Sequence, residues 1–286
     1  MNRLFAALLL CSFMLTSCAQ KSDYVVTIKT SYGDMVAILY NETPKHKKNF
    51  VKLAKEHYFD SLLFHRVIQG FMIQGGDPDS KKAQPGQHLG MGGPGYTIDA
   101  EFNPKYFHEK GALSAARLGD QQNPTKASSG SQFYIVQGTT YSEDELKTDQ
   151  HKLNQALQQY CQNPANKSDY DSIVKFYQSN NMKGYQSYLI SLKPKVEKET
   201  GISLNKDIAP ERLKAYTTIG GAHHLDDQYT VFGKVIKGLE VIDRIAAVPK
   251  GAGDRPREDI RMIVTVEEMS KKKIEKLYGY TYPEAQ

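Results

Sequence analysis

The sequence predicts a mainly β fold, an antiparallel barrel or sandwich, with a long helical insertion. Three observations support this prediction. Two runs typical of β-strands flank a turn at residues 32–34, short apolar runs alternate with glycines over residues 62–138, and glycine becomes scarce over about residues 141–214. A hydrophobic content of 40% and a charged content of 24% are those of a globular chain that can bury a core.

The N-terminus has the features of a bacterial lipoprotein signal. Arg3 precedes an apolar stretch at residues 4–15, which is too short to span a bilayer, since roughly 20 residues are needed. The stretch ends in LTSC at residues 15–18, which resembles the lipobox, where the cysteine receives a lipid. We therefore expect residues 1–17 to be removed as a signal peptide and the acylated Cys18 to be attached to a membrane. An ordinary secretory signal with a chance cysteine is the alternative.

Residues 18–24 are then a short tether, and the mature chain belongs to the cell envelope. It would be anchored on the periplasmic or surface face of a bacterial membrane, with the outer membrane favoured in a host that has one, because Gln20 rather than an acidic residue follows Ala19. Cys161 remains as the one other cysteine, so no intramolecular disulfide is expected. The net charge of +5 is spread along the chain, and no basic run is interleaved with aromatic residues, so we expect no nucleic-acid partner.

The first elements follow directly after the tether. Residues 25–30 and 35–40 are rich in β-branched residues on either side of the turn, so they predict a β-hairpin. Thr43 and Pro44 predict the start of a helix, with threonine as the N-cap and proline at the first helical position. Phe50 begins a series of apolar residues at helical spacing that would face the core.

The insertion over residues 141–214 is expected to be helical. Ser142 and Glu145 have the spacing of a capping box, which marks a helix N-terminus. The apolar residues that continue on one face of the predicted helix are Leu146, Leu153, Leu157 and Tyr160. Beyond the insertion we expect a strand at 229–235, a helix at 239–247, a strand at 260–266 and a charged tail over 268–286 that need not belong to the core.

Three segments carry a specific signal: residues 64–77 (FHRVIQGFMIQGGD), 130–135 (GSQFYI) and 225–235 (LDDQYTVFGKV). In this order they resemble the active-site segments of the cyclophilin family of peptidyl-prolyl cis/trans isomerases. The resemblance covers about residues 25–140 and 215–267, which would form one isomerase domain around the insertion. It implies an eight-stranded antiparallel β-barrel capped by two helices, with the active site on its outer face.

The resemblance also implies an isomerase that acts on Xaa-Pro bonds. With the N-terminal signal, we expect its substrates to be exported proteins, whose folding it would assist. Rotation of an Xaa-Pro amide has a barrier of roughly 18–20 kcal/mol, because twisting destroys its resonance. No bond is made or broken, so no cofactor or metal is expected. In the twisted amide the prolyl nitrogen becomes a hydrogen-bond acceptor, so a fixed cationic donor stabilises the transition state more than the ground state. By the resemblance Arg66 is this catalytic donor.

The resemblance assigns further residues to substrate binding. They are Phe71, Met72, Gln74, Ala116, Arg117, Gln132, Tyr134, His224, Leu225 and Tyr229. Four of them depart from the common family residues. Arg117 replaces asparagine and would add positive charge beside the cleft, Tyr134 replaces phenylalanine, and Tyr229 replaces histidine. His224 stands in place of tryptophan or phenylalanine, which predicts weak sensitivity to cyclosporin.

Two questions stay open at this stage. The insertion is either an inert helical lobe or an arm that recruits substrate, the latter suggested by its many tyrosines. A second function class is a non-catalytic, membrane-tethered peptide-binding module or holdase chaperone, suggested by the substituted residues of the cleft. The expected partners are proline-containing unfolded or partly folded proteins and, through the N-terminal lipid, a membrane, with the chain itself a monomer. His223 and His224 have no carboxylate or cysteine at ligand spacing, so no metal site is expected.

Overall fold

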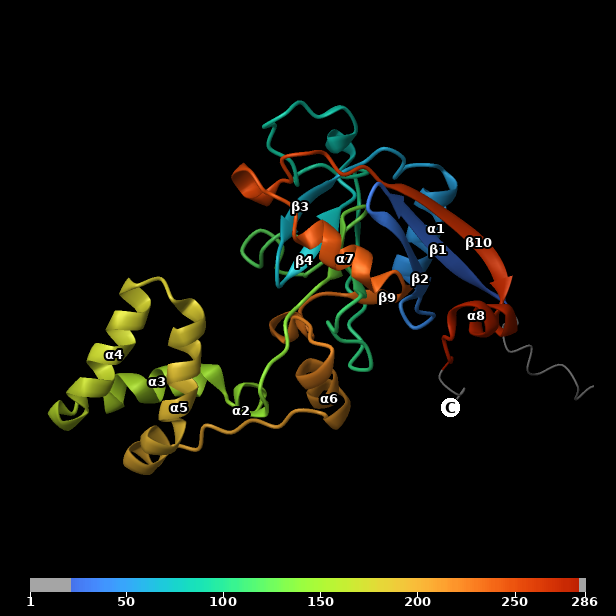
Figure 1. The fold of residues 1–286 in the computed structure, drawn as a ribbon. Helices are drawn as coiled ribbons and strands as arrows, with labels where there is room; N and C mark the ends of the chain where they lie inside the picture. Colours follow the sequence, from blue (N-terminus) through green and yellow to red (C-terminus); the bar gives the residue numbers. More distant parts are fainter. Residues whose placement is uncertain (1–21, 283–286) are drawn as a thin grey trace, which may run out of the picture. The chain divides into compact units, whose positions relative to one another are not determined.

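The computed structural model describes residues 22–282, which form two compact units (Figure 1). One unit comprises residues 22–137 and 224–282, and the other comprises Gly138–His223. The predicted signal peptide and Cys18 lie outside the described residues. Within those residues no helix is both long and apolar enough to cross a membrane.

The first unit is built on one eight-stranded antiparallel sheet. Its strands, in sheet order, are β10 (Ile263–Ser270), β1 (Ser22–Thr30), β2 (Gly33–Leu39), β9 (Val231–Lys237), β6 (Ala112–Ala115), β8 (Phe133–Val136), β4 (Met72–Gly75) and β3 (Phe64–Ile68). Backbone hydrogen bonds from Phe64 to Ile260 and from Met262 to Leu62 connect the two edge segments, at 2.9 and 2.8 Å. The sheet therefore curls into a barrel, as the sequence predicted. The short strands β5 (Thr97–Ile98) and β7 (Ser128–Ser129) form a separate pair.

Two helices cover the core of the barrel. Helix α1 (Pro44–Lys55) contacts β9 and β10, and α7 (Leu239–Ala246) contacts β2, β3 and β4. Their apolar faces join the strands in one cluster, in which Phe50 stacks on Phe59 and meets Phe133 edge-on, with ring centroids 4.9 and 5.4 Å away. Both predicted helices are present. Apolar burial of this kind contributes about 25 cal/mol per Å² and holds the strands in register.

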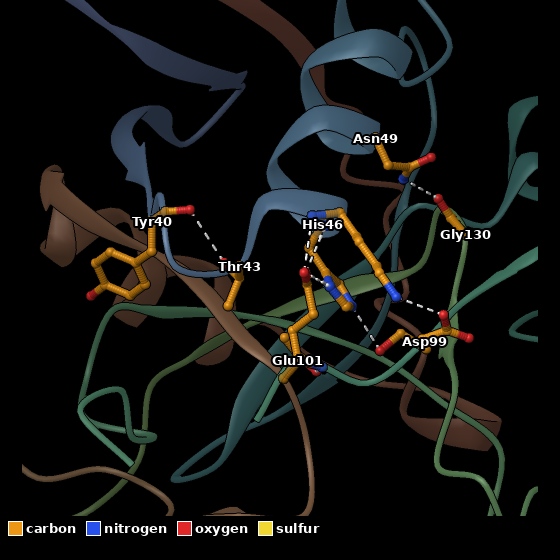
Figure 2. Close-up of polar contacts among 10 residues, drawn as sticks. Tyr40, Thr43, His46, Asn49, Asp99, Glu101 and Gly130 are labelled. Atoms are coloured by element: carbon orange, nitrogen blue, oxygen red, sulfur yellow. Dashed lines mark hydrogen bonds and ion pairs between the residues drawn. The ribbon is translucent and has the colours of Figure 1, made fainter. Parts of the chain in front are cut away.

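The N-terminus of α1 is capped from a distant loop rather than by its own threonine. Thr43 occupies the N-cap position and Pro44 the first helical position, as predicted, but the Thr43 hydroxyl donates to the Tyr40 carbonyl at 3.3 Å instead of capping the helix. The Glu101 carboxylate accepts the backbone N–H groups of Lys45 and His46 at 3.0 Å each (Figure 2). A carboxylate at this position also favours the positive end of the helix dipole.

The described residues from 268 onward pack on the first unit. Strand β10 continues to Ser270, whose hydroxyl caps helix α8 (Lys271–Tyr278). Ile274 of this helix is fully buried in a small cluster with Val25 and Met269 on the outer face of the sheet. This helix therefore belongs to the first unit, because its apolar face covers β1 and β10.

The second unit is helical. Its elements are α2 (Glu143–Leu146), α3 (Gln150–Tyr160), the 3-10 turn η2 (Pro164–Asn166), α4 (Lys167–Gln178), α5 (Met182–Thr200) and α6 (Pro210–Thr218). The capping box of Ser142 and Glu145 is present. The helix expected to run through Leu146 and Leu153 is divided in two, because the Asp149 side chain caps a new N-terminus at α3. Helices α3, α4 and α5 pack around a core that includes Leu153.

Candidate active site

A β-bulge orients the predicted catalytic residue. In the pairing of β3 with β4, Phe64 lies opposite Gly75 and Arg66 lies opposite Gln74, so His65 is an extra residue in β3. Phe64 and Val67 are three residues apart and would face opposite sides of a regular strand, yet both are buried in the core. Because of the bulge, the side chains of Phe64 and Val67 both face the core, while Arg66 between them stays partly exposed.

A cavity of about 1100 Å³ lies in the first unit, and Arg66 lines it. The other predicted site residues that line it are Phe71, Met72, Gln74, Ala116, Arg117, Tyr134, Leu225 and Tyr229. Gln132 and His224 are not part of this lining. Gln132 bonds the Gln74 side chain, and the His224 ring centroid lies 5.3 Å from that of Phe71. The fold thus gathers around one cavity residues that are far apart in the sequence.

A chain of side-chain amides fixes the polar edge of the cavity. Gln132 Nε2 donates to the Gly92 carbonyl at 2.7 Å, and Gln74 Nε2 donates to Gln132 Oε1 at 3.1 Å. This leaves Gln74 Oε1 as an acceptor for Arg66 Nη1, at 3.5 Å. On its other side Arg66 Nε lies 3.8 Å from Asp254 Oδ2, while 42% of the arginine side chain stays exposed. The guanidinium is therefore held at its edges and remains accessible from the cavity.

The wall of the cavity contains the thioether of Met72 and the phenol of Tyr134. Met72 and Tyr134 are 2% and 5% exposed. The Tyr134 hydroxyl is hydrogen-bonded to His108 Nε2 at 2.9 Å, so this bond is not made to a group in the cavity. Burial raises the pKa of Tyr134 well above its usual value, so the phenol stays neutral. Burial also lowers the pKa of His224.

Arg117 lines the cavity, and its positive charge there is paired. Its guanidinium lies over the Tyr229 ring, 4.4 Å from the centroid, and its Nη1 is 2.6 Å from Asp120 Oδ1. Its Nε donates to the Gln228 carbonyl at 2.9 Å, and only 4% of the side chain is exposed. The paired guanidinium therefore supports the aromatic wall.

Sequence reasoning missed two further parts of the cavity. Residues 85–90 and 251–259 line it, and the latter segment contributes Asp254. His65 also lines the cavity, although it is 4% exposed, and burial lowers its pKa to about 4. No periodic pattern marks these loops, so the one signal in the sequence was the position of His65 inside the first active-site segment.

Comparison with known proteins assigns the chain to a family. The profile of the family described as "Cyclophilin type peptidyl-prolyl cis-trans isomerase/CLD" matches residues 25–156 and 202–267. The chain belongs to the cyclophilin family. The predicted family and enzyme class are thereby confirmed, and this cyclophilin is a peptidyl-prolyl cis/trans isomerase.

Individual relatives agree with this assignment. A Staphylococcus haemolyticus protein named as a candidate peptidyl-prolyl cis-trans isomerase is 30% identical over 245 residues, which cover 84% of this chain and 89% of that protein. A Streptococcus pyogenes protein named as a candidate bifunctional phosphatase and isomerase is 32% identical over 85% of this chain, which spans 38% of that longer protein.

A solved structure bears on the fold. The crystal structure of a cyclophilin-type isomerase from Cryptosporidium parvum superimposes with a TM-score of 0.50 at 21% identity, and covers 86% of this chain and 98% of that one. This similarity supports the fold alone, and it confirms the predicted eight-stranded antiparallel arrangement.

Proposed function

We propose that this cyclophilin isomerises Xaa-Pro bonds of exported proteins, and assists their folding, while attached to a membrane through a lipid on Cys18. The observation that carries the catalytic part is the accessible Arg66 guanidinium beside a cavity whose lining includes the apolar side chains of Phe71, Met72 and Leu225. The apolar residues accept a proline ring, the paired amides of Gln74 and Gln132 bind the flanking backbone, and Arg66 donates to the prolyl nitrogen as the amide twists. The lipobox-like residues 15–18 support the location.

The catalytic part is tested by comparing the purified chain with its Arg66→Ala variant on an Xaa-Pro peptide. Loss of a donor aimed at the transition state costs about 2.7–4 kcal/mol, so we expect kcat/KM to fall by about a hundredfold or more. Peptide affinity should change much less, because Arg66 acts mainly on the twisted amide. An Arg66→Ala variant as active as the wild type would contradict the role of this residue.

The tether is tested separately, in cells that express the full chain. We expect membrane fractions to contain the wild type, with a diacylglyceryl-modified N-terminal peptide in mass spectrometry. The Cys18→Ser variant should lack the modification and leave the membrane fraction. Equal membrane association of both forms would retire the lipid anchor. Sedimentation of the detergent-solubilised protein tests the expected monomer.

A second candidate function has support from the helical unit, taken by itself. Tyr177 and Met182 lie at the adjoining ends of α4 and α5 and are 66% and 51% exposed, and the Tyr177 ring lies 6.1 Å from that of Tyr185. Exposed apolar side chains that lie together can bind other chains. We propose that this cluster binds unfolded segments, which would make the insertion a recruiting arm or a holdase.

The two functions differ in what abolishes them. A holdase would still suppress aggregation of an unfolded protein after Arg66→Ala, whereas an isomerase would no longer accelerate its folding. The Tyr177→Ser/Met182→Ser variant should keep full activity on a tetrapeptide and lose activity on an unfolded protein. Deleting residues 141–214 should have the same effect. Equal retention of activity on both substrates would identify the insertion as an inert lobe, and equal losses on both would contradict a role confined to recruiting unfolded chains.

A further inference from the structure

A buried histidine that the isomerisation chemistry does not use lies against the wall of the cavity. His108 is fully buried and precedes strand β6. Its Nδ1 lies 3.0 Å from Asp226 Oδ1, and its Nε2 lies 2.9 Å from Tyr134 Oη. The same Asp226 oxygen accepts the backbone N–H of His108 at 2.9 Å. Both ring nitrogens are therefore bound by groups from other segments of the chain.

These contacts fix the direction of each hydrogen bond. An ionised carboxylate accepts only, so His108 Nδ1 carries a hydrogen, and in the neutral imidazole Nε2 then offers its lone pair. In that tautomer the Tyr134 hydroxyl is the donor to Nε2. A buried hydroxyl without a partner is costly, so this bond allows a tyrosine to form part of an apolar wall.

The ring geometry extends the influence of His108 to the neighbouring walls. Its ring is nearly parallel to that of Tyr134, at 12° and 6.0 Å between centroids, and meets Tyr229 edge-on at 6.4 Å. Tyr134 and Tyr229 themselves meet edge-on at 6.0 Å. Asp226 follows Leu225 in the chain, and Leu225 also lines the cavity. His108 thus connects three lining residues without lining the cavity itself.

We propose that His108 is a positioning residue that sets the shape of the proline pocket by fixing the Tyr134 ring and the segment around Asp226. This inference rests on the proposed use of the cavity as the proline pocket. Because His108 makes no contact with Arg66, its effect belongs to ground-state binding rather than to the rate of twisting.

The test is the His108→Leu variant, studied by titration with an Ala-Pro tetrapeptide and by steady-state kinetics. This change leaves the Tyr134 hydroxyl buried without its acceptor, while Asp226 keeps the backbone hydrogen bond. We expect the Kd and KM of the peptide to rise about tenfold and kcat to stay within about twofold. Adding Tyr134→Phe removes the orphaned hydroxyl, so the double variant should bind within about threefold of Tyr134→Phe alone.

A matched control separates positioning from general loss of stability. His46 is 3% exposed and is bound in the same manner, with Nδ1 2.7 Å from Glu101 Oε2 and Nε2 2.9 Å from Ser128 Oγ (Figure 2 shows the contact with Glu101). His46→Leu should lower Tm as His108→Leu does, yet leave peptide affinity unchanged. Equal affinity losses in both variants, no loss in His108→Leu, or failure of Tyr134→Phe to rescue would overturn the proposal. Because Kd is measured without turnover, a wild type that binds but does not isomerise would contradict the catalytic proposal alone.

Discussion

The active-site arginine depends on a residue far away in the sequence. Gly253 and Asp254 have φ values of +65° and +59°, a left-handed conformation that glycine adopts freely and aspartate tolerates better than most residues. This turn brings the Asp254 carboxylate to 3.8 Å from Arg66 Nε and 3.6 Å from Lys250 Nζ. The hydrogen bond from Arg66 to Gln74 is long at 3.5 Å, so Asp254 restricts a side chain that is otherwise loosely held.

We expect Asp254→Asn to lower kcat by up to about fivefold, since partly exposed ion pairs contribute about 0.2–1 kcal/mol. The reason is that a less restricted guanidinium spends less time in the donating position. Stopped-flow isomerisation of a tetrapeptide measures this, with peptide Kd as a separate readout that should not move. Glu258→Gln removes an equal charge from the same lining segment and is the control. If both variants lower kcat equally, the effect is one of net charge and the positioning role of Asp254 is refuted.

Some residues of the site could be predicted from the sequence, and others could not. Arg66, Met72 and Tyr134 lie on strands within the motifs that predicted them, and the structure gathers them around one cavity. The orientation of Arg66 depends in addition on the bulge at His65, which the strand period does not predict. Asp254 and His108 act through contacts 188 and 26 residues away in sequence, to Arg66 and Tyr134. Such pairings depend on loop paths, and no local pattern of hydrophobicity or propensity encodes these.

At the scale of elements, one carboxylate joins the three longest helices of the second unit. Asp169 of α4 accepts a hydrogen bond from Tyr160 of α3 at 2.7 Å and from Tyr188 of α5 at 2.8 Å. Lys195 of α5 lies 3.1 Å from the same carboxylate. The hydrogen bond from Tyr160 has the largest effect on the pKa of Asp169, which it holds below its ordinary value although burial alone would raise it. Tertiary contacts of this kind stabilise helices of 11 and 12 residues, which are marginal alone.

Asp169→Asn should therefore loosen this helical unit. Hydrogen bonds to a charged acceptor contribute about 1.5–3 kcal/mol, and we expect a loss of about 2 kcal/mol in the free energy of unfolding of the unit. Hydrogen exchange of amides in α3 and α5 measures this locally. The control is Asp171→Asn, which breaks an exposed pair with Lys167 on the same helix. Equal exchange rates in the two variants would show that Asp169 is not the junction of the unit.

Some helices and their boundaries could be predicted from local sequence signals, and others could not. The two helices of the barrel followed from cap residues and apolar periodicity, which are local signals. The acceptor for the first turn of α1 is Glu101, 55 residues beyond His46, so a reading of local caps assigns that role to Thr43 instead. The division of the expected helix at residues 147–149 likewise depends on Asp149, whose capping role competes with a continuous apolar face.

The whole molecule combines two units with different titrating groups. In the first unit, burial lowers the pKa of His65 to about 4 and also lowers the pKa of His46. Asp77 opposes the shift at His65, while Arg66 and Arg255 add to it. For His46, Glu101 opposes the shift and Lys45 adds to it. In the second unit the groups with a lowered pKa are carboxylates, those of Asp149, Asp169 and Glu199. Both units therefore lose stability as the pH falls, but the histidines of the first unit respond at a higher pH than the carboxylates of the second.

The first unit should therefore lose stability at a higher pH than the second. Below about pH 6.5 the unfolded chain protonates its histidines, whereas folded His65 stays neutral down to about pH 4. Stability of the first unit falls across that interval, by up to about 3 kcal/mol from His65, because one pKa unit corresponds to about 1.36 kcal/mol. The contribution of Asp169 is present above its ordinary value near 3.8 and is lost only as the pH falls below it.

Hydrogen exchange from pH 7 to 3.5, corrected for the intrinsic pH dependence of exchange, resolves the two units in one sample of the full chain. We expect protection of β4 and β8 to decline between about pH 6.5 and 4, while protection of α3 and α5 holds until about pH 4. His65→Leu removes one titrating group and should flatten the decline in the first unit without altering the second. Asp169→Asn should leave the first unit unaltered. In the second unit it should lower protection at neutral pH and make that protection depend less on acid. A single transition shared by both units, unmoved by either substitution, would mean that they unfold together and that these buried groups do not set the acid limit of the fold.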